Sequence, residues 1–91
     1  MLEATVKVVN RLGLHARAAA QLVRLAGTFE SSIILLRPDR SVSANAKSIL
    51  SVLTLAAAVG TELTITVEGE DEEAALSEIS ALFANRFGES F

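Results

Sequence analysis

The sequence predicts an α+β fold in which one sheet carries helices on one face, with the element order β-α-β-β-α-β-α. Segments in which polar and apolar residues alternate are typical of strands that bury one face. Between them lie segments whose apolar residues recur at helical spacing. No repeat, linker or low-complexity segment interrupts the 91 residues, so we expect residues 1–91 to form a single domain.

The first predicted elements are a strand and a helix joined by a turn. Residues 4–9 alternate in polarity and are rich in β-branched side chains, which favours a strand. Residues 10–13 form the expected turn, a helix is predicted from about Ala16 to Ala26, and Gly27 is a suitable stop. The face predicted to pack on the sheet consists of Ala19, Leu22, Val23 and Ala26.

The middle of the chain predicts two strands and a second helix. Ser32–Leu36 is the second strand, residues 37–40 form a turn that Pro38 favours, and Ser41–Ala44 is a short third strand. Ser48 begins a helical stretch, and Gly60 closes the connection that follows it. The shared face of that helix is predicted to be Ile49, Val52, Leu53 and Ala56.

The last third predicts a strand followed by a helix. Glu62–Val67 alternates throughout, and Gly69 ends the strand. Asp71 is the expected N-cap of the final helix, which has acidic residues in its first turn and ends near Gly88. Its buried stripe is predicted to be Leu76, Ile79 and Phe83, with Leu82 beside it.

Composition excludes several classes of protein. The absence of cysteine excludes disulfides and thiol chemistry, and a single histidine excludes a multi-histidine zinc site within one chain, so we expect no metal and no cofactor. The net charge of −3 argues against a general nucleic-acid binder. Because no apolar run is long enough to span a bilayer and the N-terminus lacks a signal-peptide layout, we expect a cytoplasmic protein with no direct membrane insertion.

The single histidine lies where the first strand gives way to the first helix, in Gly13-Leu14-His15-Ala16-Arg17. A neutral imidazole is nucleophilic and can accept a phosphoryl group without activation by a base. The backbone N–H groups of Ala16 and Arg17 and the guanidinium of Arg17 can bind phosphate oxygens at a helix start. A lone histidine is more often an ordinary polar residue, but its combination with Gly13 and Arg17 in this setting favours phosphoryl chemistry.

A second candidate site is Ser48 in Ala46-Lys47-Ser48-Ile49-Leu50, for which two interpretations remain open. Serine is a favoured N-cap, and this interpretation is the stronger one from physical chemistry alone. The alternative is regulatory phosphorylation, since a phosphate suits the positive end of a helix. Leu50 lies off the predicted buried face, so it is either a scattered surface leucine or part of a docking surface. The acidic residues 68–73 lack the spacing of a calcium loop.

These two segments resemble the active-site and regulatory-serine segments of HPr, the histidine-containing phosphocarrier family of the bacterial phosphoenolpyruvate:sugar phosphotransferase system. The segment from Thr61 to Glu72 is similar to the last strand and final-helix entry of that family, and the resemblance covers essentially the whole chain. It implies an open-faced β-sandwich: a four-stranded antiparallel sheet covered on one face by three helices.

The resemblance also implies a mechanism and partners. His15 would accept phosphate on Nδ1 from phospho-enzyme I and pass it to enzyme IIA domains, and Arg17 would stabilise the phosphate. Ser48 would match the site of an HPr kinase/phosphorylase in organisms that possess one. A monomer is expected, and its partner-docking face would consist of Ala20, Arg24, Ile49, Leu50 and Leu53.

Two departures from the family pattern bear on these expectations. The family usually carries proline directly after the arginine, where this chain has Ala18; alanine also favours a helix, so the first helix should still begin there, with a less rigid loop. The second helix of the family usually ends near a glycine, whereas residues 55–59 reach Gly60 without one, which predicts a longer helix.

Several functions remain open on the sequence. With no nucleotide-binding loop and no further acid–base constellation, we expect a phosphoryl carrier and not an enzyme. A carrier of the nitrogen-related branch, or a mainly regulatory paralogue, would differ only in its partners. From other classes, a small ligand-binding regulatory domain predicts saturable small-molecule binding. An interaction domain predicts partner binding that His15→Ala leaves unchanged.

Overall fold

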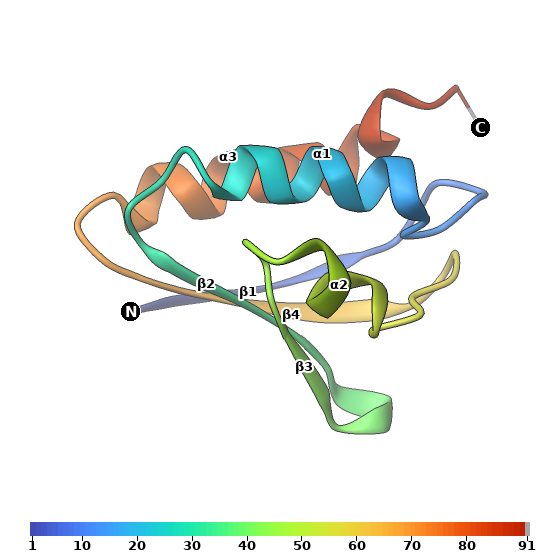
Figure 1. The fold of residues 1–91 in the computed structure, drawn as a ribbon, viewed down its shortest axis with the longest axis horizontal. Helices are drawn as coiled ribbons and strands as arrows, with labels where there is room; N and C mark the ends of the chain where they lie inside the picture. Colours follow the sequence, from blue (N-terminus) through green and yellow to red (C-terminus); the bar gives the residue numbers. More distant parts are fainter. Residues whose placement is uncertain (91) are drawn as a thin grey trace.

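The computed structural model describes residues 1–90 and consists of a four-stranded antiparallel sheet with three α-helices on one face (Figure 1). The predicted order of elements and the open-faced architecture are confirmed. The strands are β1 (Leu2–Lys7), β2 (Ser32–Arg37), β3 (Val42–Asn45) and β4 (Glu62–Glu68). The helices are α1 (Ala16–Ala26), α2 (Ile49–Leu53) and α3 (Glu72–Ala84), with short 3₁₀ turns η1 (Pro38–Arg40) and η2 (Arg86–Gly88).

The sheet has the order β1-β4-β2-β3, so β4 lies between β1 and β2 and every neighbouring pair is antiparallel. Strand alternation sets which side chains are buried. In β2, Ile33 and Leu35 are buried, while Ile34 and Leu36 lie on the other face and are each 36% exposed. In β4, Leu63, Ile65 and Val67 are buried and the two threonines between them are half-buried. One face of the sheet is therefore packed and the other is open.

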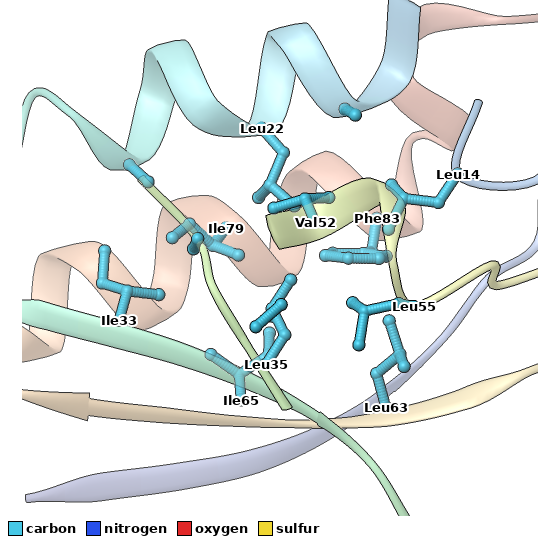
Figure 2. Packing of buried hydrophobic residues seen from close by; sticks show 14 of the residues in the cluster. Leu14, Leu22, Ile33, Leu35, Val52, Leu55, Leu63, Ile65, Ile79 and Phe83 are labelled. Carbon is cyan, nitrogen blue, oxygen red and sulfur yellow. The ribbon is translucent and has the colours of Figure 1, made fainter. Parts of the chain in front are cut away.

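The core lies between this packed face and the three helices. Figure 2 shows Leu22 of α1, Val52 of α2 and Phe83 of α3 above the apolar side chains of the sheet. All three are at most 1% exposed. Burying an apolar side chain of this size contributes about 1.5–3 kcal/mol, so these contacts hold the helices on the sheet. Within residues 1–90, no helix is long and apolar enough to cross a membrane.

The first helix follows the sequence closely. It spans Ala16–Ala26 as predicted, and Ala18 is fully buried in its first turn, so alanine at the usual proline position does begin the helix. Val23 is half-buried and packs against the edge of the core, and Ala18 joins the buried face of the helix. The first strand was predicted two residues too late, since it covers Leu2–Lys7.

The second helix differs from its prediction in length and in its buried face. It ends at Leu53, and Ile49 and Leu53 remain 39% and 37% exposed, so the packing residues are Val52 and Leu55. The expectation of a longer helix is also wrong. Ala56 has a φ of 48°, in the left-handed region, and two N–H donors of the Arg37 guanidinium bind the carbonyls of Leu55 and Ala56 at 2.9 Å each. These bonds stabilise a backbone that has left the helix.

The start of the third helix also departs from the prediction. Asp71 occupies the N-cap position, but its side chain makes no capping hydrogen bond. Its carboxylate instead accepts from the backbone N–H groups of Glu30 and Ser31, at 2.9 and 3.0 Å, and from the Ser31 hydroxyl. Asp71 therefore ties the start of α3 to the entry of β2 rather than capping α3.

The third helix also ends earlier than predicted. It stops at Ala84, before Gly88, and its fully buried side chains are Ala75, Ile79 and Phe83, while Leu76 and Leu82 are half-buried. Phe87 then packs edge-on against Phe83, with ring centroids 5.0 Å apart. This contact turns the end of the chain back over the helices.

Candidate functional site

His15 is the N-cap residue of α1 and presents one ring nitrogen at the helix start. Its backbone is extended, with φ −77° and ψ 179°, and its carbonyl accepts from the Ala19 N–H at 2.8 Å. Nδ1 of the ring accepts a hydrogen bond from the backbone N–H of Arg17 at 3.3 Å. An N-cap side chain normally uses an oxygen for this purpose. Here the acceptor is an imidazole lone pair.

The other ring nitrogen is held by a residue from the far end of the chain. Nε2 of His15 makes a close hydrogen bond with Oε2 of Glu89, whose side chain is only 10% exposed. In neutral imidazole one nitrogen donates and the other accepts. Since Nδ1 accepts from Arg17 and Nε2 faces a carboxylate, these partners assign the proton to Nε2. The nucleophilic lone pair is then on Nδ1, where it accepts the weak hydrogen bond from the Arg17 N–H.

Asn10 ties the strand-to-helix loop to Glu89. It is fully buried, and its Nδ2 donates to the Gly13 carbonyl at 2.8 Å and to Oε1 of Glu89 at 3.0 Å. One amide thus fixes both the loop before His15 and the carboxylate beside it. Residue 10, predicted as part of an ordinary turn, is a buried component of the site.

Gly13 is required by its surroundings. It has a φ of 68°, and a Cβ at this position would lie 2.7 Å from the Ala57 carbonyl oxygen. The next residue, Leu14, donates its backbone N–H to that same oxygen at 2.8 Å. The loop therefore approaches the segment after α2 too closely for any side chain at position 13.

The C-terminal segment is anchored where it passes α1. Figure 1 shows this red segment passing beside the N-terminal end of α1. The Gln21 side chain donates to the Phe87 carbonyl at 3.0 Å, and Phe87 itself is buried. The backbone N–H of Glu89 donates to the Arg86 carbonyl at 2.9 Å. These bonds hold Glu89 in place beside His15.

Electrostatics keep Glu89 ionised at neutral pH. The hydrogen bond with His15 lowers the pKa of Glu89 below its ordinary value, and the bond from Asn10 and the nearby charge of Arg17 act in the same direction. Ala16 and Arg17 are exposed, so the first turn of α1 faces solvent beside Nδ1. The site can therefore offer an approaching anion a lone pair, backbone N–H groups and a cation.

Ser48 lies at the start of a different helix and has a different environment. It is the N-cap of α2, and its hydroxyl accepts from the Ser51 N–H at 3.4 Å. The capping interpretation is thus confirmed. Ser48 is half-buried.

The expected docking residues lie on two neighbouring helices. On α2, Leu50 is 75% exposed, with Ile49 and Leu53 less so. On α1, which packs against α2, Ala20 is half-buried and Arg24 is exposed. Arg24 also lines a shallow hollow with Leu82 of α3, so it lies at the border between α1 and α3 as well.

Sequence reasoning identified His15, Ala16 and Arg17 but missed Asn10 and Glu89. The structure brings all five together. Asn10 gave only a weak sequence signal, because asparagine is common in turns and its presence there does not mark a site residue. For Glu89 the sequence offers no indication, because 74 positions separate it from His15. No group of three or more acidic, histidine or cysteine side chains in residues 1–90 is arranged to hold a metal.

Comparisons with known proteins identify the family of this chain. The family model PTS-HPr, described as "PTS HPr component phosphorylation site", matches residues 2–85. The chain belongs to the HPr family. The phosphocarrier protein HPr of Treponema pallidum is 51% identical over 89 residues, which cover 98% of this chain and 99% of that protein.

Solved HPr structures share the fold. A structure titled HPr-C-His from Thermoanaerobacter tengcongensis has a TM-score of 0.94 and 36% identity, with all of both chains covered. Another from that organism, titled an HPr dimer, has a TM-score of 0.77 and 37% identity, with 98% of this chain and 100% of the other covered. This chain is accordingly an HPr phosphocarrier of the phosphotransferase system, a carrier and not an enzyme. The family favours this class over a ligand-binding regulatory domain.

Proposed function

We propose that His15 accepts a phosphoryl group on Nδ1 from phospho-enzyme I and passes it to enzyme IIA domains. The observation that carries this proposal is the difference between the partners of the two ring nitrogens. Nε2 is engaged by the Glu89 carboxylate, while Nδ1 lies at the exposed start of α1, where its hydrogen-bond partner among residues 1–90 is the Arg17 backbone N–H. Nδ1 is thus the nitrogen that a donor can reach.

The transfer step needs no group besides the ring and the donor. The Nδ1 lone pair forms a bond to phosphorus while the bond between phosphorus and the donor breaks, and that electron pair leaves with the donor. The ring keeps its proton on Nε2 and takes up positive charge. The Arg17 N–H, released from Nδ1, and the Ala16 N–H can then bind phosphoryl oxygens, and the Arg17 guanidinium adds a charge-assisted bond.

The same chemistry makes the product a donor. A phosphoryl group on nitrogen is more labile than one on a serine oxygen. The second acceptor can therefore take the group directly from His15. Both transfers use one residue on an exposed helix start, and therefore the donor and the acceptor must dock in turn on the same surface. A carrier with these properties needs no cofactor.

The partners are proposed to dock on Ala20, Arg24, Ile49, Leu50 and Leu53. Leu50 is 75% exposed, and exposed large apolar side chains on neighbouring helices suit the apolar centre of a transient interface. Phosphorylation of Ser48 by an HPr kinase/phosphorylase would place a charge beside this patch and weaken docking. We expect the carrier to act as a cytoplasmic monomer; sedimentation analysis distinguishes this from a dimer like the one in the T. tengcongensis structure.

The test is phosphorylation with phosphoenolpyruvate and enzyme I, followed by intact-mass analysis. We expect a gain of one phosphate that is lost in acid, survives base and is absent in His15→Ala. Labelling of His15→Ala would overturn the proposal, because another residue would then be the acceptor. Running the reaction with enzyme I of the sugar branch and of the nitrogen-related branch identifies the branch that this chain serves.

A further inference from the structure

We infer that Glu89 is a positioning residue that holds His15 in the tautomer with its proton on Nε2 and so directs phosphorylation to Nδ1. This inference rests on the proposed function of His15 and extends it to a residue in the C-terminal segment. The contact between Oε2 of Glu89 and Nε2 of His15 carries the argument. It connects residues 74 positions apart, so it depends on the tertiary fold.

Both ring nitrogens have partners that agree on the same tautomer. A carboxylate can only accept a hydrogen bond, so Nε2 must donate to Glu89. A backbone N–H can only donate, so Nδ1 must accept from Arg17. In solution, imidazole distributes its proton between the two nitrogens and the ring rotates freely. In this site both degrees of freedom are restricted before a donor arrives.

Glu89 is itself held in position, which a chance surface contact would not require. Its Oε1 accepts from the buried Asn10 amide at 3.0 Å, and its side chain is only 10% exposed. The Gln21 bond to the Phe87 carbonyl fixes the segment two residues earlier. Pairs in which a carboxylate orients a histidine serve the same purpose in metal sites, where the carboxylate fixes the tautomer and ring orientation.

The charge of Glu89 contributes in a second way. Attack by Nδ1 leaves positive charge on the ring with the proton at Nε2, directly against the carboxylate. Glu89 lies against the ring, and the charge of Arg17 is close enough to lower the pKa of the Glu89 carboxyl. Glu89 therefore stabilises the charge that develops as the phosphoryl group arrives.

Two variants separate these contributions. Glu89→Gln keeps an oxygen that can accept from Nε2 but removes the charge, whereas Glu89→Ala removes both. Glu78→Gln, an exposed position on α3, is the matched control for loss of one carboxylate. The ring tautomer is observed directly from the ¹⁵N chemical shifts of His15, and the rate of phosphorylation by enzyme I is measured by rapid quench.

We expect the wild type and Glu78→Gln to show Nε2–H imidazole and equal rates. Glu89→Ala should show a mixture of tautomers and phosphorylation slower by about tenfold, as found for lost orienting partners in metal sites. Glu89→Gln should keep the Nε2–H form and lose part of the rate. An unchanged tautomer and rate in Glu89→Ala would overturn the inference. If Glu89→Ala did not fold, two other results would decide. An unchanged phosphorylation rate in Glu89→Gln would overturn the electrostatic role of Glu89. Finding the proton on Nδ1 of His15 in the wild type would overturn its positioning role.

Failure of the inference is distinguishable from failure of the proposed function. If the wild type is labelled on His15 and Glu89→Ala is labelled equally fast on the same nitrogen, only the role of Glu89 is lost. If the wild type is not labelled on His15 at all, the proposed function is lost, whatever the ring tautomer.

Discussion

α1 and α2 both begin at a residue whose side chain accepts a hydrogen bond from a backbone N–H of its own first turn. His15 accepts from Arg17 at 3.3 Å, and Ser48 accepts from Ser51 at 3.4 Å. The two helix starts differ in what else holds the residue. His15 is bound on its second nitrogen by Glu89, which is held in turn by the buried Asn10. The hydrogen bond that the structure places on the Ser48 side chain is local.

This difference separates a reactive group from a helix cap. A serine cap needs only its own helix, and α2 is short and keeps Ile49, Leu50 and Leu53 partly exposed at the surface. A nucleophile that must present one particular nitrogen needs contacts from several parts of the chain, since a local cap fixes neither the ring nor its tautomer. The long-range contacts from Asn10 and Glu89 therefore distinguish His15 from the serine that caps α2.

The largest expected effect is a loss of stability when the loop that presents His15 is disturbed. In Gly13→Ala, the added Cβ would meet the Ala57 carbonyl oxygen at 2.7 Å with φ at 68°. We expect the free energy of unfolding to fall by about 2–3 kcal/mol, from backbone strain and from the clash. Gly60→Ala is the matched control, because its φ is 91° but no atom lies within 4 Å of the added Cβ, and it should cost about 1 kcal/mol.

Chemical denaturation of both glycine variants makes this measurement. Equal losses would show that strain alone matters and that the close approach of the His15 loop to residue 57 adds nothing.

Removal of the guanidinium is the next largest effect, this time on transfer. Arg17→Ala should keep the fold, because the side chain is exposed, and should slow phosphorylation of His15 by roughly 10- to 100-fold, the worth of one charge-assisted hydrogen bond. Arg40→Ala, in the exposed turn η1, is the control for loss of a positive charge. Rapid-quench labelling by enzyme I measures both, and equal rates for the two variants would remove Arg17 from the site.

At α2, two substitutions of Ser48 distinguish its helix-capping role from the effect of a negative charge at that position. Aspartate caps a helix about as well as serine, so Ser48→Asp should leave the unfolding midpoint nearly unchanged while it weakens transfer from enzyme I by placing a charge beside the apolar surface. Ser48→Ala should transfer normally and lose about 0.5–1 kcal/mol of stability. Unaltered transfer in Ser48→Asp would leave this serine with a capping role alone.

The smallest effect concerns the third helix start, where Asp71 binds β2 instead of its own helix. The Ser31 hydroxyl, followed by the Glu30 N–H, lowers the pKa of Asp71 below its ordinary 3.8. A carboxyl with a lowered folded-state pKa contributes stability above its unfolded-state pKa and loses it as the pH falls through the folded-state pKa. Asp71→Asn should therefore have a lower melting temperature than the wild type at pH 7. The difference between the two melting temperatures should narrow below about pH 4. Thermal melts across this pH range measure the difference in melting temperature. A difference that does not change with pH would contradict stabilisation by the ionised Asp71 carboxylate.

The sequence predicted the elements whose patterns are local. The bounds of α1, the alternation of β4 and the site residues His15, Ala16 and Arg17 all follow from neighbouring residues. The face of α2 could not be predicted, because its end depends on the Arg37 guanidinium reaching the carbonyls of Leu55 and Ala56 from another strand.

Two of the five site residues, Asn10 and Glu89, were likewise beyond local patterns. Glu89 meets His15 because Phe87 packs on Phe83 and Gln21 holds the Phe87 carbonyl, and these contacts arise only when α1 and α3 lie side by side. Asn10 becomes a component of the site through the same packing, since its amide joins the first loop to the last segment.

The most direct measurement is the position of the phosphorus on the ring. Phosphorylated wild-type protein labelled with ¹⁵N in its single histidine allows the bonded nitrogen to be identified by NMR from its coupling to ³¹P. We expect coupling at Nδ1, with Nε2 still carrying its proton against Glu89. Phosphorus on Nε2, or on any residue other than His15, would contradict the assignment of Nδ1 as the nucleophile.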